Sequence, residues 1–298
     1  MVKLRFHEVM IPNNQIKALL NLIEDPDEEI FIQVKNELLF LGLDVVPNIE
    51  EAWEKNPFGK NYLIKLENII HEIQFKDIYN SLINWKEAGA ENLIDGVILV
   101  NKFQYPELNR KKIEKQLKTI VQDAQIELTA HMTGLEKITV LNDIIYKVHG
   151  FSGNKDDYYS PSNSFLNSVL DRKKGNALIL AIIYLEIANR LDIPLKGINL
   201  PNHFILGCPD GVKFAKNNEK MYSMLFYINA FSSGHILSKM DITEFLDKIN
   251  ADHKPEYYNP CSNQDIVKRL ITNLKYSYKK KGTPEKIKEL ELLLSIFK

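Results

Sequence analysis

Apolar residues recur at helical spacing through roughly the first hundred residues. From Asn14 to about Phe103 they return every three or four positions, which places them on one stripe of each helix. The stripes include Ile30, Val34 and Leu38, then Leu66, Ile69, Ile70 and Ile73, and later Ile78 and Leu82. Helix-breaking residues separate them at Asp25-Pro26, Gly42, Asn56-Pro57 with Gly59, Gly89 and Tyr105-Pro106. The pattern predicts short to medium helices packed as hairpins, which Pro and Gly terminate.

A further helix is expected from Asn109 to about Leu128, with lysines on one side and an apolar stripe on the other. Beyond about Leu135 the pattern changes. One helix reaches Val148, and a polar stretch, FSGNKDDYYSPSNS, occupies residues 151–164. Its Gly, Asn, Asp, Ser and Pro favour a long loop, and long loops in compact domains often carry function.

Two helices and two strands should follow this loop. We expect a short helix over Phe165–Leu170 and a strongly apolar one over Asn176–Leu191. Aromatic and aliphatic residues then alternate with smaller ones in HFILGC, residues 203–208, and MLFYINAF, residues 224–231, which is typical of strands. A hairpin through Pro209-Asp210-Gly211 would join them.

The chain is expected to end in helices. Asp241 and Glu244 predict a capping box for a helix that reaches Ile249. Residues 262–298 predict an α-α hairpin around Lys281–Pro284. The hairpin resembles a tetratricopeptide (TPR) unit in length, and packing against the domain is the favoured interpretation because one hairpin cannot form an array.

Composition restricts the class of protein. The 298 residues are 45% hydrophobic and 26% charged, and the 38 basic residues balance 39 acidic ones. A soluble globular protein is expected, with no basic groove for nucleic acid. Two cysteines do not make a disulfide scaffold, and neither a signal-peptide pattern nor a membrane span is apparent in the sequence. We therefore expect a cytoplasmic protein with no membrane partner.

Metal and cofactor motifs are not found. The seven histidines are separated from one another, and neither zinc-ligand spacing nor a phosphate-binding glycine loop occurs. No metal and no cofactor are therefore expected.

One ordered set of residues suggests acyl-transfer chemistry. Gly175 opens the apolar helix, His203 lies on the first predicted strand and Asn229 on the second. A papain-like enzyme places its nucleophile at such a helix start, its base on a strand and an orienting residue on the next strand.

The central region also resembles a known family. Residues 151–206 are similar to the transglutaminase-like core of the bacterial SirB family, through these residues: Asn154, Tyr159, Pro161, Asn163, Ser164, Phe165, Leu166, Asp171, Arg172, Gly175, Pro201, His203 and Phe204. The resemblance extends to Gln104–Asn109 and to a helical tail, Ile266–Phe297. It implies a predominantly helical α+β fold with a helical N-terminal region (1–130), a transglutaminase-like, papain-like core with a small antiparallel sheet (131–255) and a C-terminal helical hairpin (256–298).

The sequence departs from the family pattern at the nucleophile. Active transglutaminase-like enzymes carry cysteine in a Gly-x-Cys pattern, whereas this chain reads Gly175-Asn176-Ala177. Asn229 stands where an aspartate is usual, and asparagine can still orient a histidine. Ala177, His203 and Asn229 are thus the positions of a degenerate triad.

These departures favour a non-catalytic protein, a regulatory or scaffold module that binds a peptide or protein segment in a retained cleft. The expected binding residues are Tyr159, Asn163, Asn176, His203 and Asn229. Each also has a structural interpretation: a hydrogen-bonded core histidine and its partner, a core tyrosine and two helix caps. The alternatives are a cysteine-type amidase or transglutaminase with a relocated nucleophile, and a purely structural relic. Cys208 is expected to be buried and Cys261 to be an incidental thiol.

Overall fold

The structure is a computed structural model that describes residues 13–55, 58–214 and 220–298. The N-terminal twelve residues, where a signal peptide would lie, and the break expected at Asn56-Pro57 are outside the described residues. The chain divides into two compact units, residues 1–81 and 82–298. The second unit contains the end of the expected helical region together with the expected core and the C-terminal hairpin.

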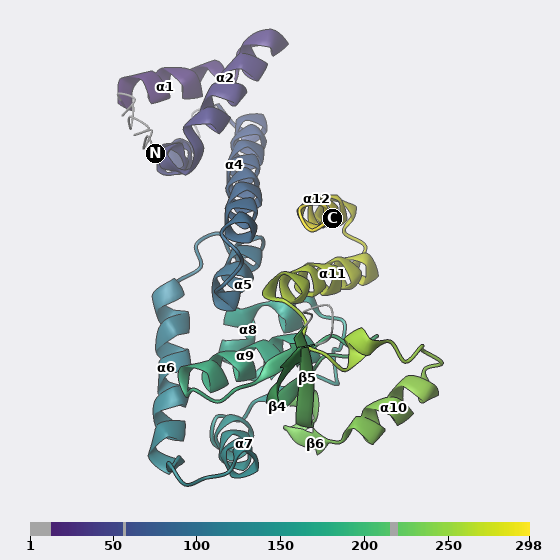
Figure 1. Ribbon diagram of the computed structural model, residues 1–298. Coiled ribbons are helices and arrows are strands. Elements are labelled where there is room, and N and C mark those ends of the chain that lie inside the picture. The colour runs from purple at the N-terminus through teal and green to yellow at the C-terminus, as the bar shows by residue number, and fades with distance from the viewer. Residues whose placement is uncertain (1–12, 56–57, 215–219) are drawn as a thin grey trace, which may run out of the picture. The chain divides into compact units, whose positions relative to one another are not determined.

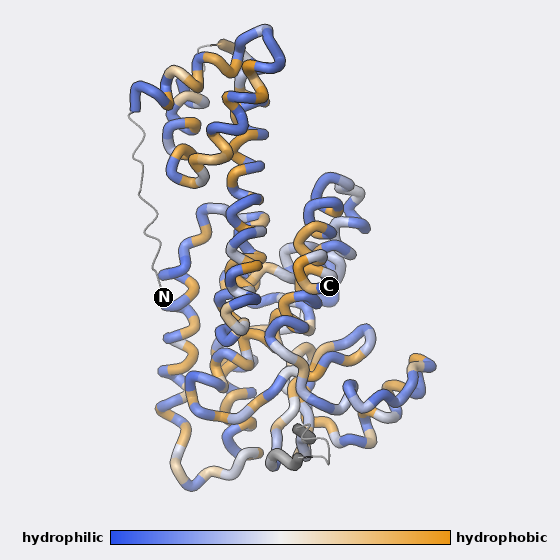
Figure 2. The backbone as a smooth tube through the Cα atoms, turned by 45° about the horizontal axis from the view of Figure 1, so that its top comes forward, coloured by the Kyte–Doolittle hydropathy of each residue, from blue (hydrophilic) through white to orange (hydrophobic). Residues whose placement is uncertain are grey.

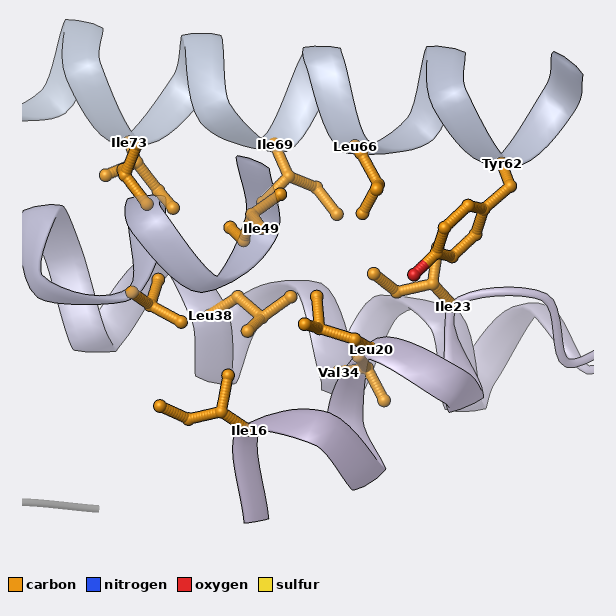
Figure 3. Close-up of a cluster of buried hydrophobic side chains, with 12 residues drawn as sticks. Ile16, Leu20, Ile23, Val34, Leu38, Ile49, Tyr62, Leu66, Ile69 and Ile73 are labelled. Carbon is orange, nitrogen blue, oxygen red and sulfur yellow. The ribbon is translucent and has the colours of Figure 1, made fainter. Parts of the chain in front are cut away.

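The first unit is helical. Its helices are α1 (Asn13–Leu22), α2 (Glu28–Leu41) and α3 (Val46–Lys55), with a 3-10 turn at Gly42–Val45, and the first part of α4 (Lys60–Glu87). Their apolar stripes meet in one buried cluster, shown in Figure 3. The helices α1 to α3 match the expected lengths, but α4 has 28 residues. No Gly or Pro interrupts it between Lys60 and Glu87, so its stripe continues through the whole segment.

The second unit is an α+β assembly, which confirms the predicted fold class. Its longer helices are α5 (Leu93–Lys102), α6 (Arg110–Glu127), α7 (Gly134–Asn142), α8 (Leu166–Arg172), α9 (Ala177–Arg190), α10 (Lys239–Lys248), α11 (Asn263–Lys281) and α12 (Pro284–Ser295). A π-helix spans Asp143–Val148, and 3-10 turns lie at Pro161–Ser164, Ala230–Ser232 and Pro255–Tyr257. Along the helices hydrophobic and hydrophilic segments alternate (Figure 2), as expected where one face is buried.

The sheet has four antiparallel strands in the order β3-β4-β5-β6. They are β3 (Lys196–Ile198), β4 (Ile205–Phe214), β5 (Lys220–Asn229) and β6 (His235–Leu237). A short parallel pair joins β1 (Ser152–Gly153) to β2 (Lys174–Gly175). Helix α9 is buried along most of its length and packs against β3 and β4 (Figure 1).

Four local expectations are wrong. His203 precedes β4 rather than lying on it, and β5 ends at Asn229, where a 3-10 turn begins. Pro209-Asp210-Gly211 is not a hairpin turn, because β4 continues to Phe214 and absorbs this segment as a β-bulge. The capping box of α10 uses Ser238 and Asp241 instead of Asp241 and Glu244, so the helix begins three residues earlier. The α11–α12 hairpin is confirmed.

In the described part of the chain, none of the helices has the length and apolar character that a membrane crossing requires.

Candidate functional site

The start of α9 is fixed by its own cap. Asn176 Oδ1 accepts a hydrogen bond from Ile179 N at 2.9 Å, and its Nδ2 donates to Ser164 Oγ at 2.6 Å. The preceding residue must be glycine, since a Cβ on Gly175 would lie 2.7 Å from Ile179 Cγ2. This packing places Ala177 at the first position of the helix, which matches the capping role expected for Asn176.

His203 lies just before β4, and Asn229 is the last residue of the neighbouring strand β5. Asn229 Oδ1 accepts from the backbone N–H groups of Phe231 (3.1 Å) and Ser232 (3.2 Å), which holds the turn after β5. The His203 ring lies 5.9 Å from the ring of Phe245, centroid to centroid. Burial lowers the pKa of His203 below its ordinary value, a side-chain hydrogen bond with Asn229 opposes this, and the charge of Arg269 adds to the lowering. The imidazole is therefore held mainly neutral near pH 7.

Ala177, His203 and Asn229 line one pocket of about 420 Å³, which we call the Ala177 pocket. The rest of its wall is largely apolar and aromatic: Tyr158, Leu200, Asn202, Ile205, Phe231, Leu237, Asp241, Ile242, Phe245 and Ile249. Ligand pockets commonly combine such apolar walls with a few polar groups, and this volume lies in their usual range. The pocket is thus suited to an apolar group flanked by hydrogen-bonding atoms.

Three other expected binding residues lie outside the lining of this pocket. Tyr159 packs its ring 5.2 Å from Tyr158 and 5.6 Å from Tyr276, and it is about half exposed. Asn176 is occupied as a helix cap. Asn163 is buried; it does not cap α8, which has no side-chain cap.

Asn163 instead fastens the loop that carries Tyr158. Its Nδ2 donates to the carbonyl oxygens of Asp157 (2.6 Å) and Tyr158 (3.2 Å), and its Oδ1 accepts from Asn154 Nδ2 (2.9 Å). These bonds hold the backbone of Tyr158, the residue of this loop that does line the pocket. The loop therefore positions a pocket residue through buried amides, a role that composition alone does not indicate.

Asp171 and Arg172 have separate partners. Asp171 forms an ion pair with Lys112 at 2.7 Å and accepts from Gln116 at 3.0 Å. The bond from Lys112 is the main reason that the pKa of Asp171 is lowered. Arg172 donates to Ser168 Oγ and to Asn163 Oδ1. Both residues thus brace the segment before α9.

Neither cysteine lies in the Ala177 pocket. Cys208 is buried, as expected, and burial raises the pKa of its thiol. Cys261 is not a free surface thiol: its Sγ donates to the Gly197 carbonyl at 3.3 Å, and burial raises its pKa to about 12. High pKa values keep both sulfurs protonated and weakly nucleophilic at neutral pH.

No cluster of three or more His, Cys, Asp or Glu side chains able to hold a metal ion occurs among residues 13–55, 58–214 and 220–298.

Comparison with known proteins places this chain in a family. The profile described as "Transglutaminase-like superfamily" matches residues 111–272, more than half of the chain and the whole span from α6 into α11. The chain is 28% identical to a UPF0162 protein of Xylella fastidiosa over 209 residues, which are 67% of this chain and 69% of that protein. It is 27% identical to Protein SirB1 of Salmonella typhimurium over 195 residues, which are 64% of this chain and 68% of that protein.

A longer match covers more of this chain and less of the relative. The chain is 25% identical to F-box only protein 21 of Mus musculus over 270 residues, or 91% of this chain and 40% of that protein. No solved structure matches this chain.

Proposed function

The chain belongs to the transglutaminase-like superfamily, and we propose that it is a non-catalytic member, a regulatory or scaffold module that binds a peptide or protein segment in the Ala177 pocket. One observation carries the proposal: Ala177 and His203 line the same pocket. The pattern of the active enzymes puts the nucleophilic sulfur at the position of Ala177. A methyl group there cannot form an acyl intermediate, although the space for a substrate remains.

The chemistry of the pocket supports binding of an apolar side chain with backbone attached. Its apolar wall can remove such a side chain from water, which stabilises a complex by about 1.5–3 kcal/mol for a buried Leu or Phe. His203 and Asn229 add polar atoms to the lining of the pocket. Those atoms can pair with peptide N–H or C=O groups of the bound segment.

A relocated nucleophile has no comparable support. Cys208 and Cys261 are both outside the pocket lining, and burial raises the pKa of each thiol. A cysteine-type enzyme is therefore kept as one possible result of the experiments below.

The test selects binders from a displayed random heptapeptide library with the purified chain and measures their affinity by fluorescence polarisation. We expect enriched peptides to bind the unmodified chain and to lose at least about tenfold in affinity against Ala177→Leu, which fills the pocket. Ala130→Leu is the matched control, because Ala130 is exposed and outside the pocket. The absence of enriched binders, or equal binding to both variants, would overturn the proposal.

Mass spectrometry of the selected peptides after long incubation tests the non-catalytic part. Unchanged peptide masses are expected. Cleavage, deamidation or cross-linking that disappears in Cys208→Ser or Cys261→Ser would establish the enzyme alternative instead.

A further inference from the structure

We propose that the Ala177 pocket, together with Arg269, receives the carboxyl terminus of a polypeptide whose last residue is apolar. This inference rests on the proposed function and specifies its ligand: the last side chain enters the pocket, and the terminal carboxylate pairs with the Arg269 guanidinium.

Arg269, on α11, uses only part of its hydrogen-bonding capacity within the described part of the chain. Its Nη1 donates to Asn199 Oδ1 at 3.0 Å and to the Leu200 carbonyl at 3.3 Å. Within the described part of the chain, Nε and Nη2 have no acceptor and the guanidinium has no carboxylate partner. Arg110 and Arg190, by contrast, each pair with carboxylates. The free edge of Arg269 is the kind of donor pair that binds a carboxylate with two parallel hydrogen bonds.

The neighbouring carboxylates already accept hydrogen bonds from helix-capping serines. Asp241, the acidic residue that lines the pocket, accepts from Ser238 N (2.7 Å) and Ser238 Oγ (2.6 Å). Asp265, one turn before Arg269 on α11, accepts from Ser262 N (2.9 Å) and Ser262 Oγ (2.6 Å). Neither carboxylate pairs with Arg269 in the described structure. A partly buried arginine without a counter-charge is costly, and an incoming anion would offset that cost.

Arg269 is close enough to the pocket to act on a bound ligand. Leu200, whose carbonyl it contacts, lines the pocket. Its charge acts on two further lining residues, lowering the pKa of His203 and interacting with the Tyr158 phenol. Burial is the main reason that the pKa of Arg269 itself is lowered. The Arg269 side chain is thus in contact with one residue of the pocket wall, Leu200, so a cation borders the apolar lining.

An aromatic row favours a polypeptide over a small carboxylic acid. Phe231 and Tyr158 line the pocket, and the row continues outward through Tyr159 to Tyr276 with ring-centroid distances of 5.2 to 6.1 Å. The three tyrosines are about half exposed, and the Lys280 ammonium lies over Tyr159 and Tyr276. Such a platform extends beyond the pocket and can contact residues upstream of the terminal one.

The test uses fluorescein-labelled pentapeptides of one parent sequence that end in Leu, Phe, Asp or Lys, each as free acid and as C-terminal amide. We expect the free acids ending in Leu or Phe to bind at least about tenfold more tightly than their amides, because the amide loses the charge-assisted pair. Arg269→Gln should remove this acid-to-amide ratio, and Arg269→Lys should retain part of it, since lysine keeps the charge but not the fork. A thermal unfolding scan of each variant establishes that it is folded.

Arg110→Gln is the matched control, because it removes the same charge at an arginine that pairs with Asp95, and neither Arg110 nor Asp95 lines the pocket. It should leave the ratio unchanged. Equal binding of acids and amides, with both lost in Ala177→Leu, would overturn the C-terminus inference while the proposed function stands. Binding of dodecanoate through Arg269 with no binding of any pentapeptide would assign the site to small carboxylic acids and overturn the inference. If no probe binds and the displayed library also yields nothing, both proposals fail.

Discussion

Ala177 and His203 line the same pocket although one begins α9 and the other lies in the turn before β4. Asn229, at the end of β5, lines it too. The three positions expected of a degenerate triad thus line one pocket, while the one expected to hold the nucleophile carries a methyl group. A single change at Ala177 would test how much of the chemical environment persists.

Ala177→Cys should create the most reactive thiol of the chain. A helix N-terminus stabilises a thiolate, and the neutral His203 imidazole can accept the thiol proton. We expect iodoacetamide at about pH 7 to alkylate this sulfur well before Cys208 or Cys261, as followed by mass spectrometry of the peptides. The double variant Ala177→Cys/His203→Ala is the control. Equal rates in the single and double variants would show that His203 does not act on this position.

Asn229→Asp should raise the pKa of His203. A carboxylate next to the imidazole favours the imidazolium, and an aspartate oxygen can still accept from the N–H groups of Phe231 and Ser232. An increase of about one to two units is expected, measured by NMR titration of the ring protons. In the unmodified chain the same titration should give a value below 6.5. An unchanged pKa would mean that residue 229 does not contact the ring.

Much of this site could be predicted from the sequence because local rules determine it. The cap at Asn176 and the apolar helix α9 follow from helix spacing and capping chemistry, and the order Gly175, His203, Asn229 follows from where the apolar helix and the two strand patterns fall in the sequence. Phe245 and Arg269 could not be found in this way, since α10 and α11 approach the pocket only through tertiary packing. Nothing in the local sequence distinguishes Arg269 from the other scattered arginines.

The errors have physical causes too. Pro209-Asp210-Gly211 has the composition of a turn, but a β-bulge accepts the same residues and lets β4 continue. Tyr158 and Tyr159 are adjacent and chemically alike. Only Tyr158 lines the pocket, and the buried amides of Asn154 and Asn163 hold the loop backbone at Asp157 and Tyr158 through bonds that a pattern of residue types does not reveal.

Acid should destabilise the protein through His203. The pKa of His203 is lower in the folded chain than its ordinary 6.5, so between those two values the unfolded chain binds a proton that the folded chain does not. Stability therefore rises with pH through this window and is lost as pH falls below about 6.5, by at most about 1.4 kcal/mol per pH unit. The free energy of unfolding, measured with urea at about pH 7.5 and at about pH 5.5, should differ less between the two pH values for His203→Gln than for the unmodified chain. Identical differences would contradict the lowered pKa.

In the first unit, truncation at two positions of α2 should change the free energy of unfolding by very different amounts. Leu38 is fully buried among the residues of Figure 3, whereas Phe40 is 81% exposed. Leu38→Ala should cost about 2–5 kcal/mol of unfolding free energy because it leaves a cavity, and Phe40→Ala should change it by less than about 0.5 kcal/mol. Chemical denaturation followed by circular dichroism measures both. A large loss at Phe40 would indicate that this side chain is covered by something else in solution.

The glycine of β1 should control the shape of the Ala177 pocket. A Cβ on Gly153 would lie 2.6 to 2.7 Å from three carbons of the Phe231 ring, and Phe231 lines the pocket. Gly153→Ala must therefore displace the ring or the β1–β2 pair, at an expected cost of about 1–3 kcal/mol. Gly134→Ala is the matched control: nothing lies within 4 Å of its Cβ, and as a helical position of α7 it should gain up to about 1 kcal/mol. In Gly153→Ala, both the unfolding temperature and the affinity for a pocket-binding pentapeptide should decrease. In Gly134→Ala, neither should decrease. If Gly153→Ala keeps its full stability but loses affinity, the Phe231 ring has moved into the pocket without strain elsewhere. If it keeps both its stability and its affinity, Gly153 does not pack closely against Phe231 in solution.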